Sequence, residues 1–259
     1  MKIKSKKTDL LIILILSMIF ISYTLSLNLK GISNDIKDLF VYYYAYSFLT
    51  EKFSILKIIK SVLNNSIMIS IFAEYLWIEL ERNAAYIFTR TRKTKEWITR
   101  KFIEILRDLI IIQFMQFMFA FFYFYILGFR IIHLDEFILV NLQLFILITT
   151  TQYILIIIAN LLMLKVNQVF GYFVSISLNI VSLLIWYSLY GNSKLLVAFI
   201  PFTQYLISIQ DNILINRSIP YFMQYIKDYS FYQALIYNAF FIGILILLGR
   251  KLINKHEFY

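Results

Sequence analysis

Three glutamates stand close together in the stretch EYLWIELER, and their types and spacing suit catalysis. Glu74, Glu79 and Glu81 could bind a metal or supply a general base, because paired carboxylates can do both. A metal site there would lack histidine, since both histidines of the chain flank apolar runs instead of lying within them. The competing interpretation is an intramembrane ion pair of Glu74 or Glu79 with Arg107, and we adopt it, expecting no metal and no enzyme activity in this chain.

Nucleotide chemistry is not expected either. The six glycines do not follow the G-x-x-x-x-G-K-[ST] spacing that cradles phosphates. The chain also has no cysteine for a thiolate metal site or a disulfide. We therefore expect no cofactor bound by this chain, and any ATP-driven work would require a second chain.

A further set of candidate residues is polar but uncharged. Amides and hydroxyls within the apolar runs could line a substrate path, or they could form hydrogen bonds between helices. The sequence leaves both interpretations open, and a sustained relay of charged residues, as in a proton-coupled pump, is missing. The candidate path-lining residues are Asn141, Thr150, Gln152, Asn160 and Asn179.

Membrane-spanning helices are the elements that must position these residues. The chain is 61% hydrophobic and 15% charged, with a mean hydropathy of +0.74, whereas soluble domains are about half apolar and a quarter charged. Several apolar runs reach the roughly 20 residues that a helix needs to cross a bilayer. We predict an all-α membrane protein with a single domain over residues 1–259 and six transmembrane helices. The predicted spans are about 10–27, 61–81, 103–127, 137–164, 168–190 and 231–249.

Two other apolar segments are too short to span. LFVYYYAYSFL contains Tyr42, Tyr43, Tyr44 and Tyr46, and tyrosine is enriched at the membrane–water boundary. We predict an interfacial helix there, on the outer face. LLVAFIPFTQYLISI is broken at Pro201, where a helix hydrogen bond is lost, so we predict an outer re-entrant or interfacial segment.

The distribution of charge predicts the orientation. The formal net charge is +10, which could indicate nucleic-acid binding, but basic cytoplasmic loops give a membrane protein the same excess. With six spans, the segments on one side hold 16 Lys and Arg, and the longer segments on the other side hold 9. We therefore predict a multi-pass protein of a bacterial cell membrane, in contact with lipid, with both termini cytoplasmic and no nucleic-acid partner.

The most basic stretch lies between the second and third predicted spans. It holds seven Lys or Arg between residues 82 and 101. Asn83 and Thr94 can each cap one of two short helices within it, and the second helix continues into the third span. Contact with anionic lipid explains the charge but not the aromatic and aliphatic side chains beside it. The residues that we single out are Asn83, Tyr86, Ile87, Phe88, Arg90, Arg92 and Lys93.

These features together resemble the permease subunits of ABC-2-type transporters. The resemblance rests on six spans with both ends inside, an acidic inner end of the second span, TRTRKTKEWITRKF opening the third span, and the proline-containing FIPFTQYLISI. It implies that residues 83–95 form a cytoplasmic coupling helix seated in a groove of an ABC ATPase, which holds the ATP and magnesium. It also implies a dimer with a second copy or a paralogue. The stretch NAAYIFTRTRK lacks the family's Gly-Thr pair and proline, which points to a small, divergent subfamily.

The predicted function is therefore that of the transmembrane subunit of an ABC transporter. Its substrate would be a hydrophobic peptide, an antibiotic or a lipid-like molecule that is exported or cleared. The alternative is a stand-alone membrane immunity or toxin-sequestering protein without transport. An intramembrane enzyme is a third interpretation.

Overall fold

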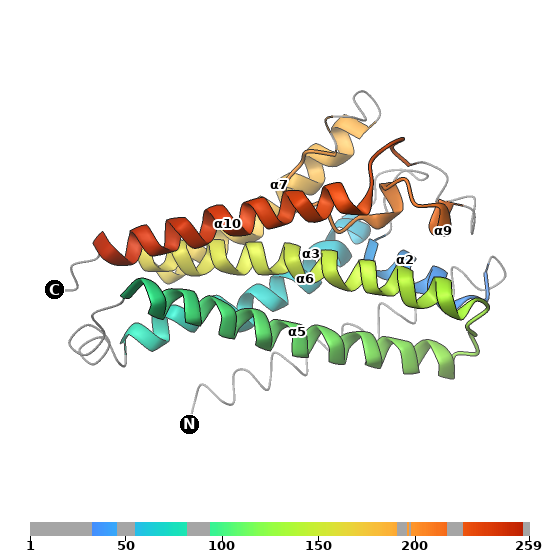
Figure 1. The fold of residues 1–259 in the computed structure, drawn as a ribbon, viewed down its shortest axis with the longest axis horizontal. Coiled ribbons are helices and arrows are strands. Elements are labelled where there is room, and N and C mark those ends of the chain that lie inside the picture. Colours follow the sequence, from blue (N-terminus) through green and yellow to red (C-terminus); the bar gives the residue numbers. More distant parts are fainter. Residues whose placement is uncertain are drawn as a thin grey trace.

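A computed structural model describes residues 33–45, 55–81, 94–190, 196, 198–216 and 225–255. Within these ranges the protein is helical and has no β-strand (Figure 1). The elements are α2 (Ile36–Ala45), α3 (Ile55–Phe72), α5 (Thr94–Ile126), α6 (Leu134–Lys165), α7 (Gln168–Tyr190), the 3-10 helix η1 (Ile207–Ile209), α9 (Ile213–Asn216) and α10 (Phe231–Lys255).

Four of these helices, α5, α6, α7 and α10, are long and apolar enough to cross a membrane. They confirm a membrane-embedded, all-helical protein, and they coincide with the last four predicted spans to within a few residues, apart from nine more residues at the start of α5 and six more at the end of α10. The first predicted span, 10–27, lies outside the described residues. The second begins earlier than predicted and is interrupted, because Ala73 and Glu74 form a turn between α3 and a further helical stretch, 75–81.

The termini of the helices form two groups, which lie at opposite ends of the bundle. Residues 75–81, the start of α5, the α6–α7 turn and the end of α10 lie together at the left in Figure 1, and we call this the basic end. There, Arg250 Nε of α10 donates a hydrogen bond of 2.9 Å to Thr99 Oγ1 of α5. At the other end, α2, α9 and the α5–α6 connection lie together. We call this the pocket end.

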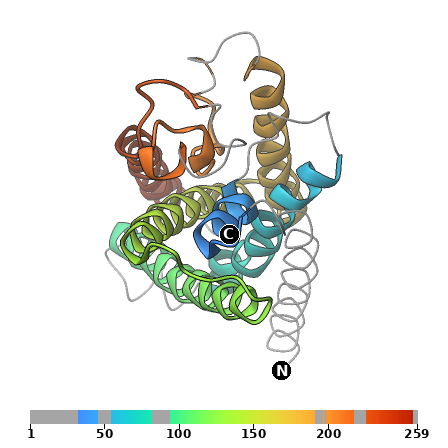
Figure 2. The same cartoon turned by 90° about the vertical axis from the view of Figure 1, so that its right-hand side faces the viewer.

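Helix α2 lies inside the bundle instead of along its surface. It contacts α5, α6 and η1 and lies near the middle of the pocket end (Figure 2). Tyr42, Tyr43 and Tyr44 are each only 8% exposed. The ring of Tyr44 stacks on Phe117 of α5, with centroids 4.6 Å apart. The prediction of a helix is confirmed, but Tyr43 and Tyr44 pack against aromatic rings of α5 inside the protein. Tyr46 lies outside the described residues.

The segment around Pro201 consists of turns that lead into η1. Gln204 Nε2 donates hydrogen bonds to the carbonyl oxygens of Ala198 at 2.8 Å and Ile200 at 3.0 Å. The hydroxyl group of Tyr229 donates to Gln204 Oε1, and burial raises the pKa of Tyr229, which keeps that hydroxyl protonated. These bonds satisfy backbone carbonyls that the non-helical path leaves free.

Helices α6 and α7 approach each other closely at Gly171. A Cβ there would lie 2.4 Å from Met163 Cγ and 2.7 Å from the carbonyl oxygen of Ala159. The backbone oxygen cannot move aside, so we expect Gly171→Ala to lower the free energy of unfolding by about 1 to 3 kcal/mol. Thermal unfolding of the purified protein in detergent would measure this.

The matched control is Gly243→Ala in α10, where a Cβ would meet nothing within 4 Å. Alanine favours helix over glycine by about 1 kcal/mol, so this variant should unfold at the same temperature or a higher one. Equal melting temperatures for Gly171→Ala and the unaltered protein would contradict the close approach of α6 and α7.

Candidate functional site

At the basic end, a charged network joins residues 75–81 to α5. Lys101 Nζ lies 3.2 Å from Glu79 Oε1 and 2.9 Å from Glu104 Oε2. The hydroxyl group of Tyr75 donates a hydrogen bond of 2.8 Å to Glu104 Oε2. We call Tyr75, Glu79, Lys101 and Glu104 the clasp. It connects the two helical segments that flank residues 82–93.

The predicted ion pair of Arg107 with Glu74 or Glu79 is wrong. Arg107 has a side chain that is 66% exposed, and its Nη2 lies 2.8 Å from Oδ1 of the adjacent Asp108. Glu79 pairs with Lys101 instead. The reason is geometric: Lys101 lies on the face of α5 that meets residues 75–81, whereas Arg107 lies on an exposed face.

Asn160 of α6 bridges the interruption after α3. In an uninterrupted helix the N–H of Leu76 would donate to the carbonyl oxygen of Phe72, four residues earlier. Here the Leu76 N–H donates to Asn160 Oδ1 at 3.0 Å, and Asn160 Nδ2 donates to the Phe72 oxygen at 3.0 Å. Nδ2 also donates to the Ile156 oxygen of its own helix at 2.9 Å. The side-chain amide thus replaces a backbone hydrogen bond, and Asn160 joins two helices.

Three buried amides meet in the middle of the bundle. Gln152 Nε2 donates to Asn65 Oδ1 at 3.2 Å, and Asn65 Nδ2 donates to Asn179 Oδ1 at 3.4 Å. We call these three residues the amide chain. It brings two of the predicted path-lining residues together through Asn65 of α3, which the sequence analysis did not single out.

The other two path-lining candidates lie nearer the pocket end of α6. Thr150 Oγ1 accepts a hydrogen bond of 2.9 Å from Asn238 Nδ2 of α10. Asn141 Nδ2 donates to the Phe137 oxygen of its own helix at 2.8 Å. Thr150 therefore contributes to helix–helix bonding, the interpretation that also fits Asn160.

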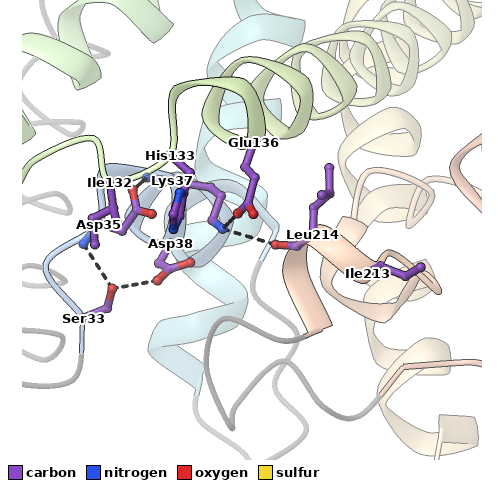
Figure 3. A pocket seen from close by; sticks show the side chains of 9 residues that line it. All are labelled: Ser33, Asp35, Lys37, Asp38, Ile132, His133, Glu136, Ile213 and Leu214. Atoms are coloured by element: carbon purple, nitrogen blue, oxygen red, sulfur yellow. Dashed lines mark hydrogen bonds and ion pairs between the residues drawn. The ribbon is translucent and has the colours of Figure 1, made fainter.

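The pocket end contains a cavity of about 410 Å³ (Figure 3). A hydrogen-bonded turn at the start of α2 forms one wall of this cavity: Ser33 Oγ accepts from the N–H of Asp35 at 3.1 Å and donates to Asp38 Oδ2 at 2.6 Å. Asp35 Oδ1 accepts from the N–H of Lys37 at 3.0 Å. Hydrogen bonds from backbone N–H groups to Ser and Asp side chains stabilise the start of a helix. The polar lining is supplied by Ser33, Asp35, Lys37, Asp38, His133 and Glu136.

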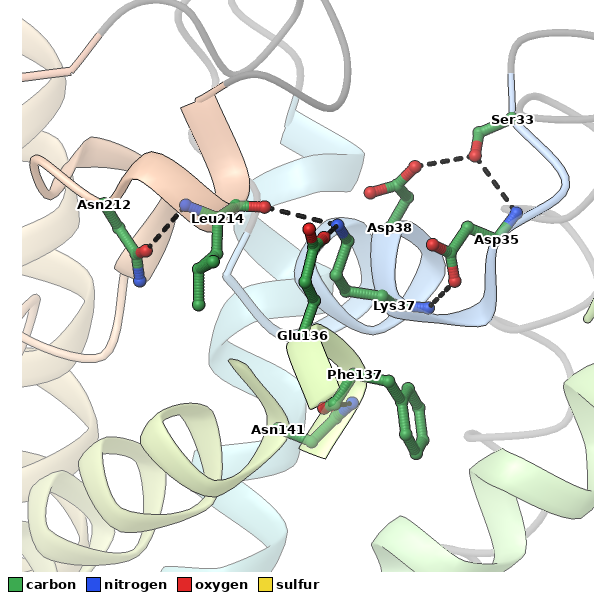
Figure 4. Close-up of polar contacts among 9 residues, drawn as sticks. All are labelled: Ser33, Asp35, Lys37, Asp38, Glu136, Phe137, Asn141, Asn212 and Leu214. Carbon is green, nitrogen blue, oxygen red and sulfur yellow. Dashed lines mark hydrogen bonds and ion pairs between the residues drawn. The ribbon is translucent and has the colours of Figure 1, made fainter. Parts of the chain in front are cut away.

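An ion pair in this cavity ties three elements together. Lys37 Nζ of α2 lies 2.5 Å from Glu136 Oε2 of α6 and 3.2 Å from the carbonyl oxygen of Leu214 in α9 (Figure 4). The Lys37 side chain is 5% exposed and the Glu136 side chain is 31% exposed. The sequence analysis missed this pair because the two residues are 99 positions apart. One signal was available and was not used: Ser33 and Asp35 precede an apolar run, which is a typical helix start.

The residues predicted to couple to an ATPase, 83–93, lie outside the described residues. Comparison of the chain with protein-family models, with curated proteins and with solved structures finds no match in any of the three.

Proposed function

We propose that this chain is the transmembrane permease subunit of an ATP-driven transporter of the ABC-2 type, with residues 83–95 as the coupling helix. The clasp is the observation that carries the proposal, because Lys101 with Glu79 and Glu104 ties together the segments on either side of residues 82–93. A displacement imposed on residues 82–93 would reach both helical segments at once. Helix α5, at 33 residues, is about 50 Å long and would pass it to the pocket end.

The remaining parts of the proposal concern partners and topology. A separate cytoplasmic ABC ATPase would hold ATP and magnesium, and a second copy or a paralogue would complete the permease dimer. The chain would cross a bacterial cell membrane six times with both termini in the cytoplasm, since its basic segments favour that side. Residues 198–216 would form the outer re-entrant segment. The substrate would be a hydrophobic or amphipathic peptide, an antibiotic or a lipid-like molecule.

The test removes the apolar side chains that would enter the ATPase. Interfaces concentrate their energy in a few buried aromatic and aliphatic residues, while charged rims affect mainly specificity and association rate. We expect Tyr86→Ala with Phe88→Ala to abolish co-purification of an ABC ATPase encoded beside this gene. Neutralising Arg90 and Arg92 should instead weaken the complex in a salt-dependent way.

A matched control truncates two exposed aromatic residues at the pocket end, Phe122 and Tyr125, which are 60% and 62% exposed. That double variant should retain the ATPase. If Tyr86→Ala with Phe88→Ala also retains it and supports normal transport, the basic segment contacts only lipid. That result, or the absence of a neighbouring ATPase gene, would favour the stand-alone immunity protein.

A further inference from the structure

The amide chain ends in two polar atoms that have no hydrogen-bond partner among the described residues. Gln152 Oε1 is an acceptor without a donor, and Asn179 Nδ2 is a donor without an acceptor. Both residues are buried, at 1% and 0% exposure. Asn65, between them, uses its Oδ1 for Gln152 and its Nδ2 for Asn179. One free acceptor and one free donor therefore remain at the two ends.

The assignment of oxygen and nitrogen in these amides does not change this result. Turning all three amides over would make Asn65 donate to Gln152 and accept from Asn179. The free atoms would then be Gln152 Nε2 and Asn179 Oδ1, which are again one donor and one acceptor. Either orientation thus leaves one donor and one acceptor for a ligand.

The amide chain lies midway along the helices that carry it. Asn65 is the eleventh of 18 residues in α3, Gln152 the nineteenth of 32 in α6, and Asn179 the twelfth of 23 in α7. One turn away in opposite directions, Thr149 Oγ1 and Ser175 Oγ are buried and also lack a partner among the described residues. The amide chain and these two hydroxyl groups thus lie along the length of the bundle, near its centre.

Unsatisfied polar groups in a membrane interior are costly, because neither lipid nor a dry protein core replaces their hydrogen bonds. The amide chain and its two neighbouring hydroxyl groups carry no charge, so a charged ligand would find no counterion among them. A neutral ligand with a hydrogen-bond donor and a hydrogen-bond acceptor would match them, with its donor at Gln152 Oε1 and its acceptor at Asn179 Nδ2. A backbone amide has this composition, and so does water.

We infer that the amide chain binds backbone amide groups of an uncharged, apolar peptide between α3, α6 and α7. The inference rests on the proposed transport function only in treating that peptide as the substrate. A water molecule offers the same hydrogen-bonding chemistry from a second source. The binding surface consists of Gln152 and Asn179 with Asn65 positioned between them.

The first experiment measures binding of tritiated N-acetyl-trileucine amide to the purified chain in lipid nanodiscs, without an ATPase. We expect saturable binding, and about tenfold weaker binding of the same peptide with its amide nitrogens methylated, because one buried hydrogen bond is lost. Gln152→Leu and Asn179→Leu should weaken binding by a similar factor. Gln143→Leu is the matched control on α6, since its Oε1 accepts a hydrogen bond from Asn212 Nδ2 outside the amide chain, and it should bind normally.

The methylated peptide tests the inference on the unaltered protein, so a variant that fails to fold does not decide it. Equal binding of the two peptides, or no binding, overturns the peptide assignment. Water-edited solid-state NMR of the protein in lipid then tests the other source. Transfer from water to the Asn179 side-chain amide supports a hydrated site of the same chemistry, and its absence overturns the inference entirely. Because no ATPase is present, these outcomes are independent of the co-purification test.

Discussion

Replacing Glu136 with glutamine should lower the free energy of unfolding by about 3 kcal/mol, whereas replacing Lys37 with methionine should lower it by about 1 kcal/mol. The difference follows from unequal burial of the two partners, 5% exposure for the Lys37 side chain and 31% for that of Glu136. Loss of the carboxylate leaves a buried ammonium without this counterion, in contact with neutral oxygens such as the Leu214 carbonyl, which is the costly way to break a buried pair. Loss of the ammonium leaves a partly hydrated carboxylate in the first turn of α6, where the helix dipole favours it.

Denaturant titration of the purified protein in mixed micelles would measure both values. The combined variant, Lys37→Met with Glu136→Gln, is the control that isolates the ion pair. It should be more stable than Glu136→Gln alone, because no buried charge is left without a partner. Equal losses for the two single variants would show that Lys37 is hydrated through the cavity and that the pair does not hold α2, α6 and α9 together.

Run length and hydropathy predicted the long helices well. A run of apolar residues has only one way to satisfy its backbone in a membrane, which is to form a helix. The bounds of α6 and α7 therefore lie within three residues of their predictions. The predicted third span begins at residue 103, nine residues after the start of α5, because hydropathy marks where the apolar run begins and not where the helix begins. Thr94, which was predicted to cap this helix, is its first residue.

The charged pairs could not be predicted in the same way. Glu79 had several basic residues within reach on the following helix, and sequence spacing does not say which of them faces it. Lys101 and Arg107 are six positions apart, which places them on different sides of α5 at 100° per residue. Only the packing of residues 75–81 against α5 decides between them. The Lys37 and Glu136 pair depends in the same way on where α2 enters the bundle.

The roles of the polar residues in the apolar runs could not be predicted from the sequence either. Their presence in apolar runs predicted that they would be hydrogen-bonded or would line a path, and it could not separate the two roles. Asn160 and Asn179 are the same residue type in adjacent helices, yet Asn160 uses both ends of its amide and Asn179 leaves its nitrogen without a partner among the described residues. The difference arises from the interruption after α3, which the sequence does not mark with glycine or proline.

The interruption after α3 should depend on Asn160. We expect Asn160→Leu to lower the free energy of unfolding by about 3 kcal/mol. An ordinary hydrogen bond between membrane helices contributes only about 0.6 kcal/mol. Here, however, the Leu76 N–H and the Phe72 carbonyl would both lose their partner, and a buried polar group left unsatisfied costs about 1 to 3 kcal/mol. Asn141→Leu on the same helix should cost less than 1 kcal/mol, because its amide bonds only the Phe137 carbonyl.

Hydrogen exchange at Leu76 distinguishes this mechanism from a general loss of packing. In the unaltered protein the Leu76 N–H donates to Asn160 Oδ1 and should exchange slowly. In Asn160→Leu it should exchange faster, while the N–H of Ala73, which follows α3 and donates to the Ile69 oxygen at 2.7 Å, should stay protected. Slow exchange at Leu76 together with unchanged stability would mean that the helix closes its own bond to Phe72 once the amide is removed. Asn160 would then be the cause of the interruption and not its support, because a side chain that holds two backbone groups apart is dispensable if they can meet directly.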